Sequence, residues 1–361
     1  MRSYRVYLVL IVVFAAVLGA LLHPFALLLG LTPLHTTATV RFLAELRSTI
    51  ADLLGWGVLG LLAAMVIFGI GGRILRRRLP ASSRPAQSAD VPTLTSPKVA
   101  VAITAYNDAE ATAQAVKDFS RQPGVIQVLV IDNNSTDQTA ALATAAGATV
   151  VREPRQGYGY ACIRGLAEGL KVRDADVIVL TEGDGTFFAT DLAKFMAYID
   201  NSDLVVGNRV VRGLVDADSQ MDHFFTWGNM AVAMLLRLRY WDGRHLGPAG
   251  LTDVGCTYRA IRREALERIL SDLEVGGYHF SPHMLLVAID HGLSVVEIPV
   301  RLRRRVGQSK GASQSVRKGL AVGLTMIWHI LTFNLRHTPR TSETATAATT
   351  GSPDLTARIS R

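Results

Sequence analysis

Two carboxylates one residue apart follow a short apolar run near the middle of the chain. Glu182 and Asp184 come directly after residues 177–181 (VIVLT), and glycines flank Asp184 on both sides. Carboxylate oxygens are the ligands that hard divalent cations prefer in proteins, and glycines allow a diphosphate to approach the backbone closely. The spacing therefore indicates a site for a cation and a diphosphate, with a solvated acidic turn as the simpler alternative.

Polar residues also follow two earlier apolar runs. The first run ends in residues 104–108 (TAYND) and the second in residues 132–137 (DNNSTD). Helix capping and turn formation would favour the same residue types. Two such clusters at neighbouring run ends favour a binding site. In that site Tyr106 offers a flat face to a base, and Asp132 can accept hydrogen bonds from a base or a ribose.

Seven basic residues lie between Arg301 and Lys318, with no acidic residue among them. Arginine forks and a lysine around residues 307–310 (GQSK) suit a phosphate group. No aromatic residue is interleaved there for base stacking, so we expect no nucleic acid as a partner. A basic face on anionic lipid is the alternative, and it is compatible with phosphate binding.

These residues must be positioned by the elements of residues 98–312, where short apolar runs alternate with helical stretches. The alternation predicts an α/β, Rossmann-like fold in which helices cover both faces of a mostly parallel sheet. Ligands then bind at the carboxyl ends of the strands. The expected strands are Val99–Thr104, Val128–Asp132, Thr149–Arg152, Val177–Thr181 and Leu204–Gly207, and the expected helices are Ala109–Arg121, Gln138–Ala146, Tyr160–Lys171 and Asp191–Asp200.

Two charge-free runs precede this domain. Residues 7–31 and 53–72 contain no Asp, Glu, Lys or Arg, and each is long enough to cross the roughly 30 Å hydrocarbon layer as a helix. We therefore expect residues 1–78 to form a transmembrane hairpin, with a cleaved signal peptide as the alternative for the first run. Four arginines between residues 73 and 78 predict that the following domain lies on the cytoplasmic side of the cell membrane.

Three further segments lack the pattern of a folded core. Residues 79–97 are rich in Pro, Ser and Ala and are expected to form a linker, and residues 341–361 are expected to form a disordered tail. Within residues 313–340, the 17 residues 319–335 carry no charge, which is marginal for crossing a membrane. We expect a membrane-associated helix that lies in the interface.

The composition excludes several classes of protein. The 361 residues carry a formal net charge of +8, and 49% are hydrophobic while only 19% are charged, which excludes a disordered chain. Two cysteines are too few for a disulfide scaffold. Residues 157–159 (GYG) lack the third glycine of a dinucleotide fingerprint, so we expect no Rossmann oxidoreductase. His279 and His283 lack a third ligand, so we expect no metal site there.

With these residues in place, the chain resembles the family 2 glycosyltransferases of GT-A fold, and among them the polyprenyl-phosphate (dolichyl-phosphate) hexose synthases. The resemblance covers residues 98–312 and is most specific at its end. The matching motifs are Thr104–Asp108 (TAYND, for P-x-Y-N-E), Asp132–Thr139 (for D-x-x-S-x-D-x-T), Glu182–Asp184 (for D-x-D), Gly207–Arg209 (for G-x-R), Gly228-Asn229, Thr252–Arg259, Glu297–Pro299 (for E-x-P) and Arg304–Lys310 (for R-x-x-G-x-S-K). Phe224 and Phe225 stand in the neighbourhood where relatives often have an arginine.

The resemblance implies roles for three groups of residues. It implies that the nucleotide is bound by Thr104, Ala105, Tyr106, Asp108, Asp132, Asn134 and Gly183. It implies that a Mg²⁺ or Mn²⁺ ion is held by Glu182, Asp184 and Thr186. It implies that catalysis involves Asp184, Arg209, Asp253, Arg304 and Lys310.

The resemblance further implies an inverting, membrane-bound transferase that moves a hexose from a nucleotide-diphosphate sugar to polyprenyl phosphate, with membrane lipids as additional partners. Two alternatives stay open. One is a glycosyltransferase that acts directly on a cell-envelope glycan, although no tryptophan of the chain lies in the Q-x-x-R-W motif usual in such synthases. The other is a catalytically inactive, membrane-tethered nucleotide binder, against which the presence of Asp184, Arg304 and Lys310 argues.

Overall fold

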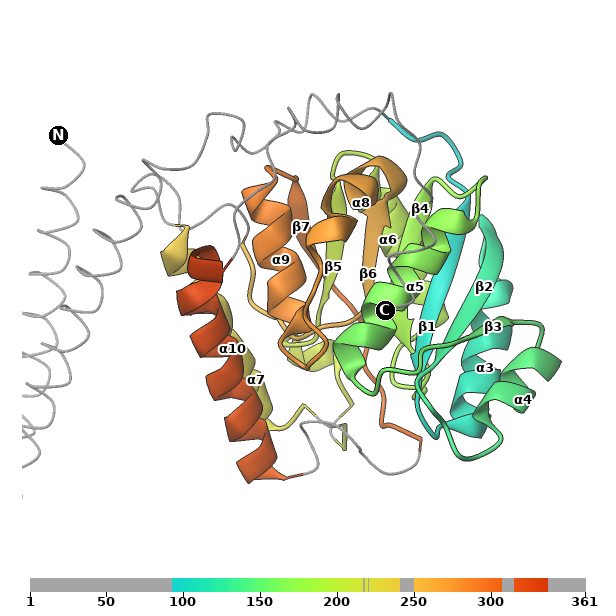
Figure 1. Cartoon of the computed structure of the whole chain (residues 1–361), viewed down its shortest axis with the longest axis horizontal. Coiled ribbons are helices and arrows are strands. Elements are labelled where there is room, and N and C mark those ends of the chain that lie inside the picture. Colours follow the sequence, from blue (N-terminus) through green and yellow to red (C-terminus); the bar gives the residue numbers. More distant parts are fainter. Residues whose placement is uncertain (1–92, 217, 220, 241–249, 307–314, 337–361) are drawn as a thin grey trace, which may run out of the picture. The chain divides into compact units, whose positions relative to one another are not determined.

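The computed structural model of the chain (Figure 1) describes residues 93–216, 218–219, 221–240, 250–306 and 315–336. The expected spans at 7–31 and 53–72 and the expected tail at 341–361 lie outside the described residues, as does most of the expected linker at 79–97. Within the described ranges, no helix is long and apolar enough to cross a membrane.

A seven-stranded sheet forms the centre of the described unit. The strands are β1 (Val99–Ala105), β2 (Val125–Asp132), β3 (Thr149–Arg152), β4 (Val177–Glu182), β5 (Leu204–Asn208), β6 (Arg259–Arg262) and β7 (Val295–Pro299). Their order across the sheet is β3-β2-β1-β4-β6-β5-β7. β6 is antiparallel to both of its neighbours, β4 and β5, and the other described pairs are parallel. The prediction of an α/β fold with a mostly parallel sheet is therefore confirmed.

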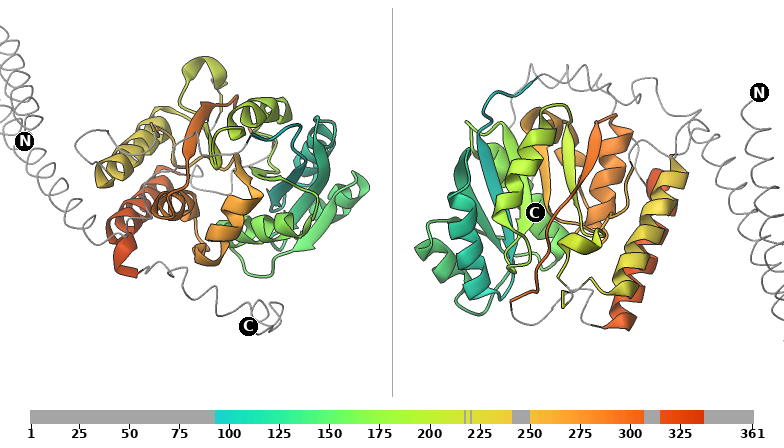
Figure 2. Two further views of the ribbon diagram at one scale, coloured as in Figure 1. Left: turned by 90° about the horizontal axis from the view of Figure 1, so that it is seen from above. Right: turned by 180° about the vertical axis from the view of Figure 1, so that it is seen from behind.

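Helices cover both faces of this sheet (Figures 1 and 2). They are α3 (Ala109–Ser120), α4 (Thr139–Ala145), α5 (Tyr158–Lys171), α6 (Leu192–Ile199), α7 (His223–Arg239), α8 (Arg263–Ile269), α9 (Phe280–Asp290) and α10 (Val316–Arg336), with short 3₁₀ turns η3 (Ala189–Asp191), η4 (Arg212–Leu214) and η5 (Leu270–Asp272). Successive strand residues point to opposite faces. Ala102 of β1 therefore packs in one core with α5, α8 and α9, whereas Val101 and Ile103 pack in a second core with α3, α4 and α6.

The elements expected from residue 99 to residue 208 are confirmed within three residues at each end, and the largest difference is β2, which begins at Val125 instead of Val128. β6 is the strand of the central sheet that the sequence gives least reason to expect, because Arg259 and Arg262 stand at its two ends. Arg259 is 1% exposed, and its guanidinium donates hydrogen bonds to the carbonyls of Cys256, Val254 and Ser281. Backbone carbonyls thus accept hydrogen bonds from a buried guanidinium, although a charged residue in a sequence usually indicates a position at the surface.

α7 and α10 lie side by side at one edge of the described unit in all ribbon views (Figures 1 and 2). One side of α10 belongs to the core, where Ile330 and Phe333 are buried. His329 of α10 also lies 3.0 Å from His283 of α9, measured between Nε2 and Nδ1. Pro282 does not interrupt α9, because it lies in the first turn, where a missing N–H is tolerated. Residues 319–335, expected to form a helix, are therefore helical and pack on the unit that contains the sheet.

Candidate active site

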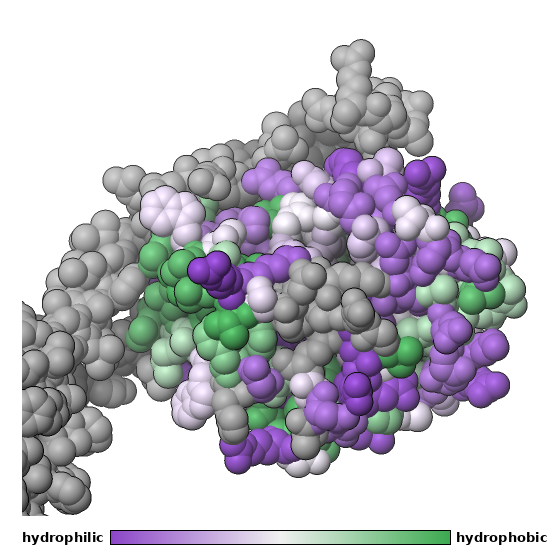
Figure 3. Space-filling model, turned by 90° about the horizontal axis from the view of Figure 1, so that it is seen from below, coloured by the Kyte–Doolittle hydropathy of each residue, from purple (hydrophilic) through white to green (hydrophobic). Residues whose placement is uncertain are grey.

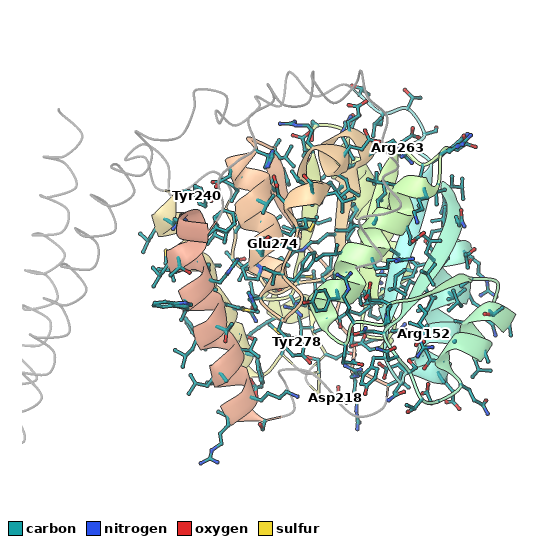
Figure 4. All side chains as sticks on the ribbon, viewed as in Figure 1. Arg152, Asp218, Tyr240, Arg263, Glu274 and Tyr278 are labelled. Carbon is teal, nitrogen blue, oxygen red and sulfur yellow. The ribbon has the colours of Figure 1, made fainter. Side chains whose placement is uncertain are left out.

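A pocket of about 580 Å³ opens at the carboxyl ends of β1, β4 and β5. Residues from the ends of these strands line it, including Ala105, Glu182 and Arg209. Tyr278, which is labelled in Figure 4 below the sheet, lines it from the loop before α9. Parallel strands end in backbone groups and turns that are free to bind ligands, which is why α/β folds place their sites at this edge.

The turn after β4 holds Asp184 in a fixed orientation. The Thr186 backbone N–H and hydroxyl both donate to Asp184 Oδ1, at 3.0 and 2.6 Å. Gly185 has a φ of +79°, and a side chain at Gly183 would place its Cβ 2.7 Å from Thr112 Oγ1. The two glycines are therefore required by backbone conformation and by close packing. The Thr186 hydroxyl, predicted as a metal ligand, positions Asp184 here.

Glu182 lines the pocket and accepts a hydrogen bond from the Thr257 hydroxyl. The Thr257 hydroxyl also bonds to Tyr158, whose hydroxyl lies 3.2 Å from Ser281 Oγ. Burial, together with the negative charge of Asp184, raises the pKa of Glu182 to about 7. Two carboxylates are thus held close together although their charges repel each other.

This donor set fits a divalent cation that shares its ligands with a substrate. No cluster of three or more His, Cys, Asp or Glu side chains that could hold a metal occurs among the described residues. Mg²⁺, however, is usually held by one or two carboxylates and completed by substrate phosphates and water. Burial is the main reason for the raised pKa of Glu182, and the charge of Asp184 adds to it; a bound cation would neutralise that charge.

Arg305 also lines the pocket, although the motif that begins at Arg304 assigns it no role. Its Nη2 lies 2.7 Å from Asp108 Oδ2, and its Nη1 lies 3.2 Å from Asp184 Oδ2. The predicted Arg304 points elsewhere: its side chain is 75% exposed and lies 3.5 Å from Asp218, near the lower edge of the view in Figure 4. In an extended segment neighbouring side chains point to opposite sides, so Arg304 and Arg305 cannot both face the pocket. The motif alone does not say which of the two does so.

The predicted nucleotide residues divide into two groups. Five of them line the pocket, namely Thr104, Ala105, Tyr106, Asp108 and Gly183. Asp132 and Asn134 are not among its lining residues. Asp132 Oδ1 accepts a hydrogen bond from the backbone of Ser135, and Asn134 donates to the carbonyl of Pro154. The pocket instead includes Asn133, whose amide oxygen accepts a hydrogen bond from the backbone of Gly157.

Arg209 enters the pocket in a fixed orientation, because Asp253 binds it through two parallel bonds of 2.8 and 3.0 Å. Asp253 is fully buried. Burial would raise the pKa of Asp253, but the charge and hydrogen bonds of Arg209 outweigh this and hold the pKa below its ordinary value. Glu297 in turn accepts hydrogen bonds from the backbone of Asp253 and Thr252. Asp253 therefore lies behind Arg209 and positions it.

The far side of the pocket is apolar. α7 contributes Phe224, Phe225 and Val232, and α10 contributes Leu320, Leu324 and Ile327, so that the pocket continues into a groove between the two helices. Figure 3 shows apolar surface gathered on the left of the face that is seen from below. The predicted Lys310 lies outside the described residues.

Comparison with known proteins identifies the family. Residues 100–270 match the model of glycosyl transferase family 2. A polyprenol monophosphomannose synthase of Mycolicibacterium smegmatis is 29% identical over 67% of this chain and 87% of its own length. An uncharacterized glycosyltransferase of Mycobacterium bovis is 32% identical over 58% of this chain and 88% of its own length. The chain belongs to glycosyl transferase family 2. The expected resemblance and the expected transferase class are thereby confirmed.

Solved structures are less similar to this chain in sequence. A glucosyl-3-phosphoglycerate synthase from Mycobacterium tuberculosis, in complex with Mn²⁺, UDP-glucose and phosphoglyceric acid, is 17% identical, with a TM-score of 0.49. The similarity covers 67% of this chain and 81% of that chain.

Proposed function

We propose that this glycosyltransferase moves a hexose from a nucleotide-diphosphate sugar to a polyprenyl monophosphate at a membrane surface. The observation that carries the proposal is the form of the pocket: one cavity joins the acidic turn at Asp184 to the apolar groove between α7 and α10. A polar donor and an acceptor with a charged head and an apolar chain both fit such a cavity. The relative named polyprenol monophosphomannose synthase supports a polyprenyl phosphate as the acceptor.

The donor would occupy the polar half of the pocket. Tyr106 is 38% exposed and offers its ring to the base, and Asp108 lies beside it. Asp132 and Asn134 remain predicted nucleotide ligands. Glu182 and Asp184 would hold Mg²⁺ or Mn²⁺, which supplies positive charge against the leaving diphosphate. Gly183 and Gly185 keep the backbone low enough for the phosphates to approach.

The acceptor would enter from the apolar half with its phosphate toward Arg209. A phosphate oxygen is already anionic, so attack on the sugar requires no strong general base. The residues must therefore position the two substrates and balance their charge. Arg209 lines the pocket. Arg304 and Lys310 remain predicted ligands of the same phosphate, and Arg304 would have to leave Asp218 to reach it. A single in-line displacement at the anomeric carbon inverts its configuration.

Transfer should depend on the carboxylate of Asp184. Asp184→Asn keeps the shape of the side chain and removes the charge, so we expect transfer to fall by at least about 100-fold. Membranes that contain the chain are incubated with radiolabelled UDP- and GDP-sugars and a polyprenyl phosphate, and the lipid product is extracted with organic solvent. We expect label in a lipid that mild acid cleaves.

The control is Glu267→Gln, because the Glu267 side chain is 55% exposed on α8 and lies outside the pocket lining. Glu267→Gln should transfer as the unaltered chain does. Label in an insoluble glycan instead of the lipid would favour the glycan-acting alternative, and near-normal transfer by Asp184→Asn would overturn the assignment of the cation site.

A further inference from the structure

Arg305 places a positive charge beside Asp184, at the proposed site of the divalent cation. Its side chain is only 12% exposed and bridges two buried carboxylates, Asp108 (7% exposed) and Asp184 (5% exposed). Its Nε is buried and has no hydrogen-bond partner among the described residues. The guanidinium therefore has a carboxylate partner at each Nη, and its third donor group, the Nε–H, is unused.

The oxygen that Arg305 contacts is the one that a metal ion would need. Asp184 Oδ1 accepts two hydrogen bonds from Thr186, which leaves Oδ2 as the oxygen more available to another ligand. Arg305 Nη1 lies 3.2 Å from that Oδ2. A metal ion that took the same oxygen as a ligand would be repelled by the guanidinium charge beside it.

We propose that Arg305 is an internal counter-ion that holds the place of the divalent cation, and that its guanidinium leaves Asp184 when cation and donor bind. This inference deepens the proposed function and rests on it. Without a cation, Arg305 offsets the repulsion between Glu182 and Asp184. With the donor bound, its fork turns to the diphosphate, for which a guanidinium is well suited.

The surrounding backbone allows this change by a side-chain rotation alone. The N–H groups of Arg303 and Val306 donate to the carbonyls of Thr186 and Asp184, at 3.0 and 3.2 Å. The main chain on both sides of Arg305 is therefore tied to the turn that carries Asp184. Asp108 remains within reach of the guanidinium as a second partner during the exchange.

Direct metal binding tests the proposal without any sugar or lipid. Mn²⁺ is titrated into the metal-free, full-length chain, and free Mn²⁺ is measured by electron paramagnetic resonance. Arg305→Gln removes the competing charge, so its Mn²⁺ dissociation constant should fall by about tenfold or more, the effect of one charge close to a carboxylate. In the presence of Mn²⁺, the same variant should bind UDP or GDP more weakly, because a phosphate contact is lost.

Arg173→Gln is the matched control, since it removes the same charge from an exposed position outside the pocket lining. Its Mn²⁺ dissociation constant should stay within about twofold of the unaltered value. Arg305→Lys, which keeps the charge but cannot bridge two carboxylates, should give an intermediate constant and decides the question if Arg305→Gln does not fold. An unchanged or weaker Mn²⁺ affinity in the Arg305 variant that folds overturns the proposal. Failure of the proposed function would appear separately, as tighter Mn²⁺ binding in a chain that labels no polyprenyl phosphate.

Discussion

The charges of neighbouring side chains in this site change one another's pKa values. Glu182 shows this most clearly, because burial and the neighbouring Asp184 raise its pKa from 4.5 to about 7. Between these two pH values the folded chain keeps a proton that the unfolded chain has lost. The stability that this group contributes is therefore complete below pH 4.5 and is lost as the pH rises through 7.

Replacing Glu182 by glutamine should consequently stabilise the metal-free protein at high pH. In EDTA at pH 8, Glu182→Gln should melt at a higher temperature than the unaltered chain, and the difference should shrink at pH 5. Differential scanning calorimetry across this range measures both. Glu267→Gln, at an exposed position, should show no such pH dependence. A pH-independent difference for Glu182→Gln would contradict the raised pKa.

At the residue scale, the sequence predicts which chemistry is present better than it predicts which side chain performs it. The motif identifies Arg304, but the extended backbone turns Arg304 toward Asp218 and Arg305 toward Asp184. Asp253 is recognisable as part of a motif, yet only the fold shows that it is buried behind Arg209. Orientation depends on register and packing, which a motif does not encode.

At the scale of elements, Gly159 at the start of α5 and Gly276 in the loop before α9 allow the helix and the loop to pack closely. The Gly159 N–H donates to the carbonyl of Gly276 at 2.8 Å. A Cβ at Gly159 would lie 2.0 Å from the carbonyl oxygen of Val275. The glycines thus allow the loop before α9, which carries Tyr278, to lie against the helix start and line the pocket.

Gly159→Ala should therefore loosen this loop and lower stability. Overpacking of this kind costs about 1–3 kcal/mol, and the Michaelis constant for the nucleotide sugar should rise because the pocket wall shifts. Urea unfolding and steady-state kinetics measure the two effects. Gly213→Ala is the control, since a Cβ there would meet no atom within 4 Å. Equal unfolding midpoints for the two variants would contradict the packing role.

The sequence predicts the parallel half of the sheet because strand and helix alternate there with the expected spacing. Further along the chain this regularity fails. β6 runs antiparallel between β4 and β5. Its buried arginines donate hydrogen bonds to backbone carbonyls of segments that are distant in the sequence. The apolar run at 319–335 predicts a helix, but only tertiary packing decides that α10 buries one side against α7 and α9.

At the scale of the whole molecule, the remaining side of α10 lacks a described partner. Val316, Leu320, Leu324 and Trp328 are between 54% and 60% exposed, and Trp227 of α7 is 68% exposed. Of these side chains, Leu320 and Leu324 also line the pocket. A helix that is apolar on its outward side is unfavourable in water but suits the membrane interface, from which a polyprenyl phosphate would enter the groove.

The position of this face relative to lipid can be measured in the full-length chain. Both native cysteines are fully buried, so a nitrobenzoxadiazole label will react at an introduced thiol. In proteoliposomes, the label at Trp328→Cys should be quenched by lipids that carry a nitroxide on the acyl chain and protected from aqueous iodide. Tyr198→Cys, at a position 50% exposed on α6, should show the opposite pattern because α6 covers the other face of the sheet. Protection of the Trp328 label from both quenchers would mean that protein, and not lipid, covers the outward side of α10, and the acceptor would then have to reach the groove by another route.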